Sequence, residues 1–128
     1  MSTQKKRDGT KPQLLVIEDN FICQQIYLAL LNNYYDIEIA GTAAEALEYL
    51  SKQIFHCIIS DIGLPDKSGM ELLPIIRNSP LNKETPIVVI SGHMSETIKQ
   101  TCLQLGATEV YTKPVTSVIV QHMIETFL

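Results

Sequence analysis

The sequence predicts an α/β fold, a doubly wound five-stranded parallel sheet with helices on both of its faces. Five short apolar runs alternate along the chain with five stretches of helical periodicity, and this alternation with short connections is typical of a parallel sheet. The first, third and fourth runs are continuously apolar, as expected of strands that helices cover on both sides. The second run is the most polar, which places it at an edge and gives the strand order 2-1-3-4-5. The predicted strands are residues 13–17, 36–40, 56–60, 86–90 and 108–112.

A helical pattern follows each predicted strand. In the first, FICQQIYLALLNN, the spacing of four apolar residues predicts that they form the buried face of the helix. These four residues are Ile22, Ile26, Ala29 and Leu30. The last pattern, TSVIVQHMIETF, predicts a closing amphipathic helix. The predicted helices are residues 21–33, 42–53, 68–78, 95–105 and 116–127.

Local signals mark where two of these helices begin. Thr42 with Glu45 is typical of a capping box at the start of the second helix, and Ser68 with Glu71 at the start of the third. Pro74 lies inside the third helical pattern. We therefore expect that helix to kink at the proline or to accommodate it.

Composition and charge narrow the class of protein. The chain has 128 residues, of which 45% are hydrophobic and 19% charged, and this suits one domain with a packed core. Residues 1–12 carry a net charge of +3, and we expect a polar, basic tail or linker there, followed by a folded domain at 13–128. Since the whole chain carries −4, the folded domain carries −7. A domain this acidic is a poor candidate for direct binding of nucleic acid.

The apolar runs are too short to cross a membrane. None approaches the ~18 residues of a transmembrane helix, and the N-terminal residues lack the apolar stretch of an export signal. Cys23, Cys57 and Cys102 lie singly in apolar surroundings, which argues against a disulfide framework or a zinc site. We therefore expect a soluble, cytoplasmic protein that makes no contact with a membrane.

Polar side chains stand at the ends of four predicted strands. In a doubly wound sheet these ends share one edge, where ligands bind, so three carboxylates are expected to meet there. A hard divalent cation such as Mg²⁺ relieves the repulsion within such a cluster. With a hydroxyl and a lysine nearby, the cluster suits attack of its central aspartate on a phosphoryl group. The residues, in strand order, are Glu18 and Asp19, then Asp61, Ser91 and Lys113.

Four segments resemble the response-regulator receiver domain of two-component signalling. Each is weakly specific alone, but the four occur in the expected order at the expected strand ends, and together they are highly specific. The resemblance covers about residues 13–128 and implies the flavodoxin-like version of the predicted fold. The segments are VIEDN (16–20), IISDIGLPDKSG (58–69), VVISG (88–92) and YTKP (111–114).

The resemblance implies a metal-dependent phospho-acceptor. Asp61 would take a phosphoryl group from the phosphohistidine of a histidine kinase or a histidine phosphotransfer domain. Asp19 would bind Mg²⁺ (or Mn²⁺) directly, with Glu18 acting through water. Asp61 itself and the backbone carbonyl of Gly63 would complete the protein ligands. Such a receiver catalyses its own phosphorylation and dephosphorylation and turns over no external substrate.

The resemblance also assigns the remaining site residues. Lys113 would pair with the phosphoryl oxygens, and the bond between Lys113 and Pro114 would be cis. Ser91 would move toward the phosphoryl group, and Tyr111 would turn inward with it to signal to a partner.

Small residues beside the site predict an accessible phosphoryl group of limited lifetime. Gly63 and Gly92 have no side chains to exclude water or a docking partner, and His93 is close enough in sequence to approach the site.

Other functions stay open at this point. A degenerate receiver that acts only as a protein-interaction module is disfavoured because no acceptor-site residue is missing. A metal-dependent aspartyl phosphatase or phosphotransferase of the haloacid-dehalogenase type needs a second aspartate two residues after Asp61, where this chain has Gly63. A nucleotide-binding module on the same kind of sheet lacks a GxGxxG or GxxxxGK[ST] motif.

The wider context is predicted only in outline. VIEDN and DIGLPDKSG most resemble receivers of hybrid sensor histidine kinases, in which residues 1–12 would serve as a linker; a single-domain regulator is the alternative. Few charged residues lie in the region of the fourth helix, fifth strand and fifth helix, so we expect a monomer or a weak dimer. The cognate kinase, the stimulus and the output are not encoded in recognisable motifs.

Overall fold

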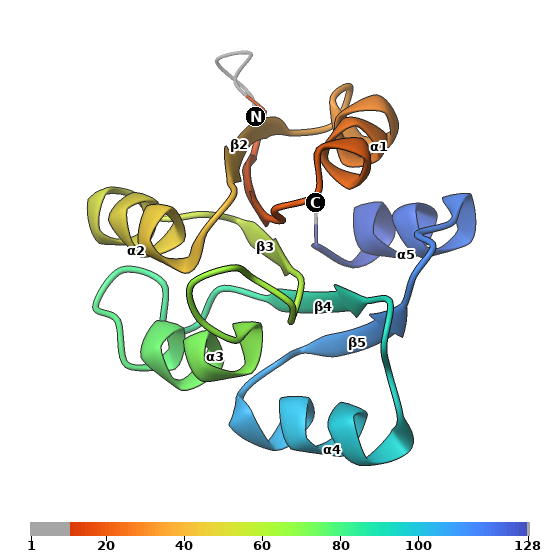
Figure 1. Cartoon of the computed structure of the whole chain (residues 1–128). Helices are drawn as coiled ribbons and strands as arrows, with labels where there is room; N and C mark the ends of the chain where they lie inside the picture. The colour runs from red at the N-terminus through yellow and green to blue at the C-terminus, as the bar shows by residue number, and fades with distance from the viewer. Residues whose placement is uncertain (1–10, 128) are drawn as a thin grey trace.

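The computed structural model describes residues 11–127 and confirms the predicted topology. The strands are β1 (Gln13–Ile17), β2 (Asp36–Ala40), β3 (Cys57–Ser60), β4 (Ile87–Ser91) and β5 (Glu109–Thr112). They pair in parallel in the order β2-β1-β3-β4-β5 (Figure 1). The predicted tail lies outside the described residues except for Lys11 and Pro12. The carbonyl of Pro12 accepts a hydrogen bond from Asp36 N at 2.9 Å, which extends the pairing of β1 with β2.

Helices cover both faces of the sheet, as predicted. They are α1 (Phe21–Leu31), α2 (Ala43–Lys52), α3 (Gly69–Arg77), α4 (Glu96–Leu105) and α5 (Ser117–Phe127). Figure 1 shows α1 and α5 on one face and α2, α3 and α4 on the other. Within the described part of the chain, no helix has the length and apolar character needed to cross a membrane.

Two hydrophobic clusters fill the space between the sheet and its helices. Successive residues of β1 alternate between them, because Leu14 and Val16 face α1 and α5 whereas Leu15 and Ile17 face α2 and α3. All four side chains are fully buried. This two-sided burial explains why the strand reads as a continuous apolar run rather than an alternating one.

The buried face of α1 differs from the prediction. Tyr27 and Leu31 lie in the core, and of the four predicted residues only Leu30 packs against it. The helix, FICQQIYLALL, is apolar almost all round, so hydrophobic periodicity does not define one face. The predicted residues that are exposed instead are Ile22, Ile26 and Ala29.

The predicted caps are present at the starts of α2 and α3. Thr42 Oγ1 accepts a hydrogen bond from Glu45 N at 3.1 Å. The Glu45 carboxylate accepts from Gly41 N at 2.7 Å, one residue before the N–H group that the predicted box would use. Ser68 Oγ accepts from Met70 N at 3.2 Å, but Glu71 does not complete the predicted box, since its carboxylate pairs with a neighbouring lysine. α3 accommodates its internal proline and continues to Arg77.

A buried asparagine ties the loop before β4 to the end of α2. Asn82 is fully buried, and its Nδ2 donates to the carbonyls of Leu50 at 3.0 Å and Gln53 at 2.9 Å. Its Oδ1 accepts from Phe55 N at 2.8 Å and from Thr85 Oγ1 at 3.0 Å. The full hydrogen-bonding capacity of this amide is used, so it fixes the segment that leads into the central strand β4.

Candidate functional site

Four strands deliver polar side chains to one edge of the sheet, as predicted. The edge is held in register beyond the ends of the strands, since Lys113 N donates to Ser91 O at 2.9 Å. Glu18 and Asp19 follow β1, Asp61 follows β3, Ser91 ends β4, and Lys113 follows β5.

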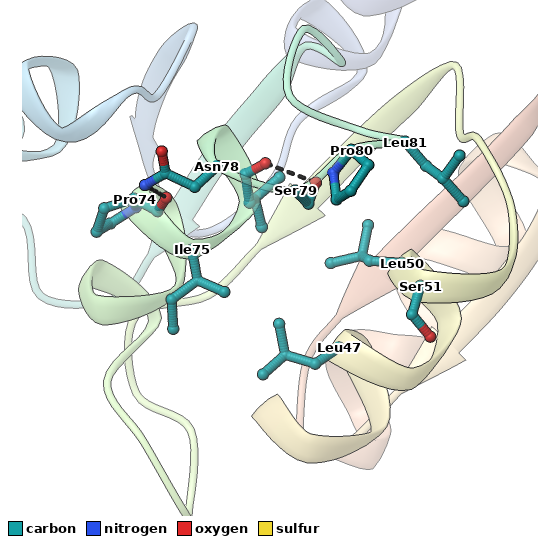
Figure 2. A pocket seen from close by; sticks show the side chains of 10 residues that line it. Leu47, Leu50, Ser51, Pro74, Ile75, Asn78, Ser79, Pro80 and Leu81 are labelled. Carbon is teal, nitrogen blue, oxygen red and sulfur yellow. Dashed lines mark hydrogen bonds between the residues drawn. The ribbon is translucent and has the colours of Figure 1, made fainter.

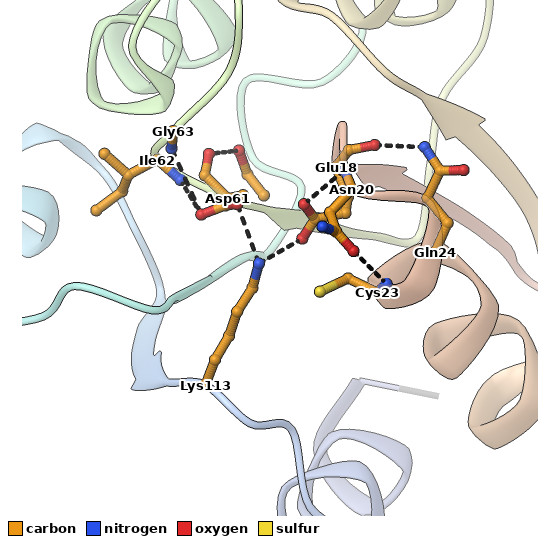
Figure 3. A network of polar contacts seen from close by, with 9 residues as sticks. Glu18, Asn20, Cys23, Gln24, Asp61, Ile62, Gly63 and Lys113 are labelled. Carbon is orange, nitrogen blue, oxygen red and sulfur yellow. Dashed lines mark hydrogen bonds and ion pairs between the residues drawn. The ribbon is translucent and has the colours of Figure 1, made fainter.

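The ammonium group of Lys113 joins two carboxylates of this edge, as Figure 3 shows. Its Nζ lies 2.8 Å from Glu18 Oε1 and 3.1 Å from Asp61 Oδ2. Burial acts to lower the pKa of Lys113, but the two carboxylates raise it well above its ordinary value. The lysine therefore stays charged. The bond that follows it, Lys113–Pro114, is cis, as the resemblance implies.

Asp61 is 9% exposed, and its carboxylate is ionised in this setting. Its Oδ1 accepts hydrogen bonds from Ile62 N at 2.7 Å and Gly63 N at 3.4 Å. Burial acts to raise the pKa of Asp61, but Lys113 and these two N–H groups outweigh it, so the pKa is below its ordinary value. The ionised carboxylate is the form in which an aspartate acts as a nucleophile.

Glu18 is 1% exposed, and each of its two oxygens has a partner. Oε2 accepts from Asn20 N at 3.1 Å. Oε1 lies 2.8 Å from Lys113 Nζ, in the ion pair described above. Burial raises the pKa of Glu18 in spite of the lysine. A buried carboxylate is costly unless its charge is compensated, and a bound cation would add to the compensation that Lys113 supplies.

Three carboxylates lie close enough to share one cation. Single oxygens of Glu18, Asp19 and Asp61 form a group whose members all lie within 4.8 Å of one another. Asp19 is exposed, whereas the other two are buried. An all-oxygen donor set that is open to water on one side suits Mg²⁺ or Mn²⁺. The structure therefore brings the predicted carboxylate ligands together, with the chemistry that such a cation requires.

Glycines shape the loop between β3 and α3 in two opposite ways. Gly63, like Gly92 after β4, is exposed, and a Cβ added at either would meet no atom within 4 Å. Neither glycine therefore has a side chain that would shield the site. At Gly69 a Cβ would overlap the backbone of Asp61. Gly69 N donates to Ile62 O at 2.7 Å, which draws the start of α3 against the end of β3.

The structure does not bring Ser91 and Tyr111 together. Tyr111 pairs with Ile90 across β4 and β5 and packs in the cluster beneath α1 and α5, where its hydroxyl donates to Glu109 Oε1 at 2.7 Å. Ser91 comes next after Ile90 and projects to the opposite face, on which the buried residue of β5 is Val110. An inward turn of Tyr111 toward Ser91 would have to cross the plane of the sheet.

Three supporting residues were missed in the sequence. Asn20 caps α1, with Oδ1 accepting from Cys23 N at 2.9 Å, and an asparagine just before a helical pattern is a usable signal for such a cap. Gln24 Nε2 donates to Glu18 O at 2.6 Å. Asp66 accepts hydrogen bonds from two backbone N–H groups of α2. No local pattern marks the last two, because their partners lie six or more residues away.

A wide apolar groove lies elsewhere on the molecule. It has a volume of about 780 Å³ and runs between the C-terminal halves of α2 and α3 (Figure 2). It contains none of the residues at the carboxyl edge of the sheet, so it is not part of the site. Its apolar walls include Leu47, Leu50, Pro74, Ile75, Pro80 and Leu81.

Comparison with known proteins decides the family. The sequence profile of the response regulator receiver domain matches residues 14–125. The chain belongs to this family. The resemblance found in the four sequence segments is confirmed, and the matched range contains every residue of the site described above.

The relatives of this receiver differ in length. It is 32% identical over 107 residues to the two-component response regulator ORR3 of Oryza sativa subsp. indica, covering 82% of each chain. It is 30% identical over 122 residues to hybrid signal transduction histidine kinase I of Dictyostelium discoideum, covering 89% of this chain but 7% of the kinase. In the structure of the receiver domain of sensor histidine kinase PA1611 from Pseudomonas aeruginosa, a magnesium ion is coordinated in the active-site cleft. That structure matches with a TM-score of 0.83 and 22% identity, over 92% of this chain and 98% of the other, which shows a common fold.

Proposed function

We propose that this receiver accepts a phosphoryl group on Asp61 from the phosphohistidine of a histidine kinase or histidine phosphotransfer domain. The observation that carries the proposal is the placement of Lys113 Nζ, 2.8 Å from Glu18 and 3.1 Å from Asp61, beside a carboxylate cluster of cation size. A lysine and a cation on either side of a nucleophile neutralise the charge of an incoming phosphoryl group. The proposed ligands of Mg²⁺ or Mn²⁺ are Glu18, Asp19, Asp61 and the backbone carbonyl of Gly63.

The transfer itself follows from these positions. An oxygen of Asp61 forms a bond to phosphorus while the P–N bond of the phosphohistidine breaks, and the bonding electrons leave with the imidazole nitrogen. Lys113 pairs with one phosphoryl oxygen, and the hydroxyl of Ser91 donates a hydrogen bond to another. The cation, when bound, supplies further neutralisation of charge. In the separate dephosphorylation step, water attacks the phosphorus, the P–O bond to Asp61 breaks with its electrons returning to the carboxylate, and inorganic phosphate leaves.

The openness of the site supports a phosphoryl group of limited lifetime. Gly63 and Gly92 are both exposed, and neither has a side chain that would shield the site from water. We therefore propose that the receiver dephosphorylates itself without a separate phosphatase. A phosphoaspartate that survives for many hours in the presence of Mg²⁺ would contradict this part of the proposal.

An exposed apolar surface beside the site supports docking of a partner. Phe21 and Ile22, at the start of α1, are each 69% exposed. A pocket of about 290 Å³ lies between α1 and the residues that follow β5, with Ile26 and Lys113 among those that line it. Because Lys113 also contacts Asp61, a partner that covers this surface brings its phosphohistidine to the nucleophile.

The place of the receiver in a larger system is also a proposal. The likeness to a Dictyostelium hybrid kinase supports a phosphorelay in which the receiver belongs to, or works with, such a kinase in the cytoplasm. We propose that it acts as a monomer or weak dimer and that Ser91 transmits the phosphorylated state to the next partner. The switch role of Tyr111 stays a prediction, which its position beneath α1 and α5 does not favour.

The decisive experiment is intact mass spectrometry after incubation with acetyl phosphate and Mg²⁺. The wild type is expected to gain one phosphoryl group, about 80 Da, and to lose this gain in EDTA. Asp61→Asn, a nearly isosteric variant, is the matched control and should gain nothing. Without any adduct in the wild type, the degenerate receiver becomes the better interpretation. Sustained release of phosphate from phosphate monoesters would instead favour the aspartyl phosphatase.

A further inference from the structure

The loop that follows Asp61 is held by a side chain that takes no part in phosphoryl transfer. Asp66 lies near the middle of the loop between β3 and α3, and both of its carboxylate oxygens reach across to α2. Oδ1 accepts a hydrogen bond from Ala43 N at 2.9 Å, and Oδ2 accepts one from Ala44 N at 3.0 Å. These are the first two N–H groups of α2, which have no partner inside their own helix.

α2 therefore has caps from two separate segments. Its own N-cap residue, Thr42, accepts from Glu45 N at 3.1 Å and leaves the two preceding N–H groups to Asp66. The hydrogen bonds from Ala43 and then Ala44 lower the pKa of Asp66, so the group is ionised. A negative charge at a helix N-terminus is also favoured by the helix dipole.

The same loop is closed at its base. The carbonyl of Ile62 accepts hydrogen bonds from Gly69 N at 2.7 Å and from Leu64 N at 3.1 Å. Between Ile62 and Asp66, Gly63 is exposed and has no side chain that could anchor it. The position of the Gly63 carbonyl therefore depends on four supports. These are the long hydrogen bond from Gly63 N to Asp61 Oδ1, the packing of Leu64 on the core, the base of the loop, and the link from Asp66 to α2.

We propose that Asp66 is a positioning residue for the cation site. By tying the loop to α2, it keeps the Gly63 carbonyl where the cation takes it as a ligand. This inference rests on the proposed function, because it requires a cation at the cluster of Glu18, Asp19 and Asp61. Ligands that neighbouring groups hold in place bind a metal ion more tightly, since less order is lost when the ion enters.

If Asp66 acted only as a cap of α2, its removal would destabilise α2 but leave the affinity for the cation unchanged. The chain offers a matched control for that case. Thr42→Ala removes the other cap of the same helix but leaves the loop and its link to α2 in place. Asp66→Ala removes the link, and Asp66→Asn keeps a single acceptor oxygen.

The experiment is a titration of Mg²⁺, followed by ¹H–¹⁵N NMR shifts, into metal-free wild type and the three variants. The temperature is one at which every protein remains folded. We expect binding about tenfold weaker in Asp66→Ala, an intermediate loss in Asp66→Asn, and an unchanged dissociation constant in Thr42→Ala. Before metal is added, hydrogen exchange of the Gly63 and Leu64 amides should accelerate in Asp66→Ala but not in Thr42→Ala.

Each outcome bears on the inference. An unchanged Mg²⁺ dissociation constant in Asp66→Ala overturns it and leaves the proposed function in place. Equal weakening in Asp66→Ala and Thr42→Ala overturns it as well, because the stability of α2 would then explain the effect. A wild type that binds no Mg²⁺ overturns the inference and the proposed cation site together. Where Asp66→Ala does not fold, the milder Asp66→Asn decides between these outcomes.

Discussion

The backbone of Asp61 lies so close to the Cα of Gly69 that position 69 has no room for a side chain. Gly69→Ala must therefore displace the start of α3 or the end of β3. We expect the free energy of unfolding to fall by about 2 kcal/mol in urea denaturation, the typical cost of overpacking. The control is Gly92→Ala, whose Cβ would meet no atom within 4 Å. Equal stability of the two variants would contradict this packing.

The second prediction concerns the buried asparagine before β4. Asn82→Ala removes the side-chain donor to the backbone carbonyls of Leu50 and Gln53. It also leaves Phe55 N without an acceptor. We expect a loss of about 3 kcal/mol in the free energy of unfolding, because several buried polar groups lose their partners at once. Asn78→Ala is the control, since that side chain is exposed and its loss should be small. Similar losses in the two variants would mean that the Asn82 network contributes little.

The third prediction is a stabilising substitution. Tyr35 is fully buried, and its hydroxyl has no hydrogen-bond partner in the described part of the chain. Tyr35→Phe removes this hydroxyl and keeps the ring, so we expect a gain of about 1 kcal/mol in thermal or urea unfolding. The neighbouring Tyr34 is exposed, and Tyr34→Phe should change nothing. A destabilised Tyr35→Phe would indicate that the hydroxyl has a partner after all, such as a buried water.

The fourth prediction tests the proposed switch residues separately. Tyr111 packs beneath α1 and α5, whereas Ser91 projects to the other face of the sheet. Addition of beryllofluoride with Mg²⁺ should therefore change the NMR shifts around β4 and α4 equally in wild type and Tyr111→Phe. In Ser91→Ala these changes should be reduced, because the variant lacks the hydroxyl that is proposed to donate to the phosphoryl group. If the shift changes were lost in Tyr111→Phe but kept in Ser91→Ala, the switch role would belong to the tyrosine.

The fifth prediction concerns the hydroxyl of Tyr111 and the pH dependence that it gives to the free energy of unfolding. Burial, together with the carboxylate of Glu109, raises the pKa of Tyr111 from 10.0 to about 12. A raised pKa means that the neutral hydroxyl stabilises the fold fully below pH 10 and that this contribution is lost as the pH rises toward 12. The difference in unfolding free energy between wild type and Tyr111→Phe should shrink over that interval. In Glu109→Gln the tyrosinate absorbance should appear at lower pH.

The topology and the centre of the site were predictable because they depend on local signals and one general rule. Apolar runs covered on both sides, such as the third strand, indicate a parallel sheet. The carboxyl ends of such strands share an edge, so Asp61 and Lys113 were expected to meet although 52 residues separate them. Once β3 and β5 lie parallel in one sheet, the residues that directly follow them lie at the same edge.

The remaining contacts depend on information that local patterns lack. The buried face of α1, with Tyr27 and Leu31 inward, is decided by how a helix that is apolar almost all round packs on the sheet. The separation of Tyr111 from Ser91 is decided by which face each side chain takes in β5 and β4. The contact of Asp66 with α2 joins segments more than twenty residues apart. Neither segment contains a local sequence pattern that predicts this contact.

The two clusters that the sheet keeps apart, one beneath α1 and α5 and one beneath α2, α3 and α4, have an evolutionary consequence. Substitutions that share no partners combine nearly additively. Surface changes on α1 that alter the choice of a partner therefore require no repacking on the far side of the sheet. The residues on the two faces of the sheet can therefore be substituted independently of each other, provided that the edge carrying Asp61 is retained.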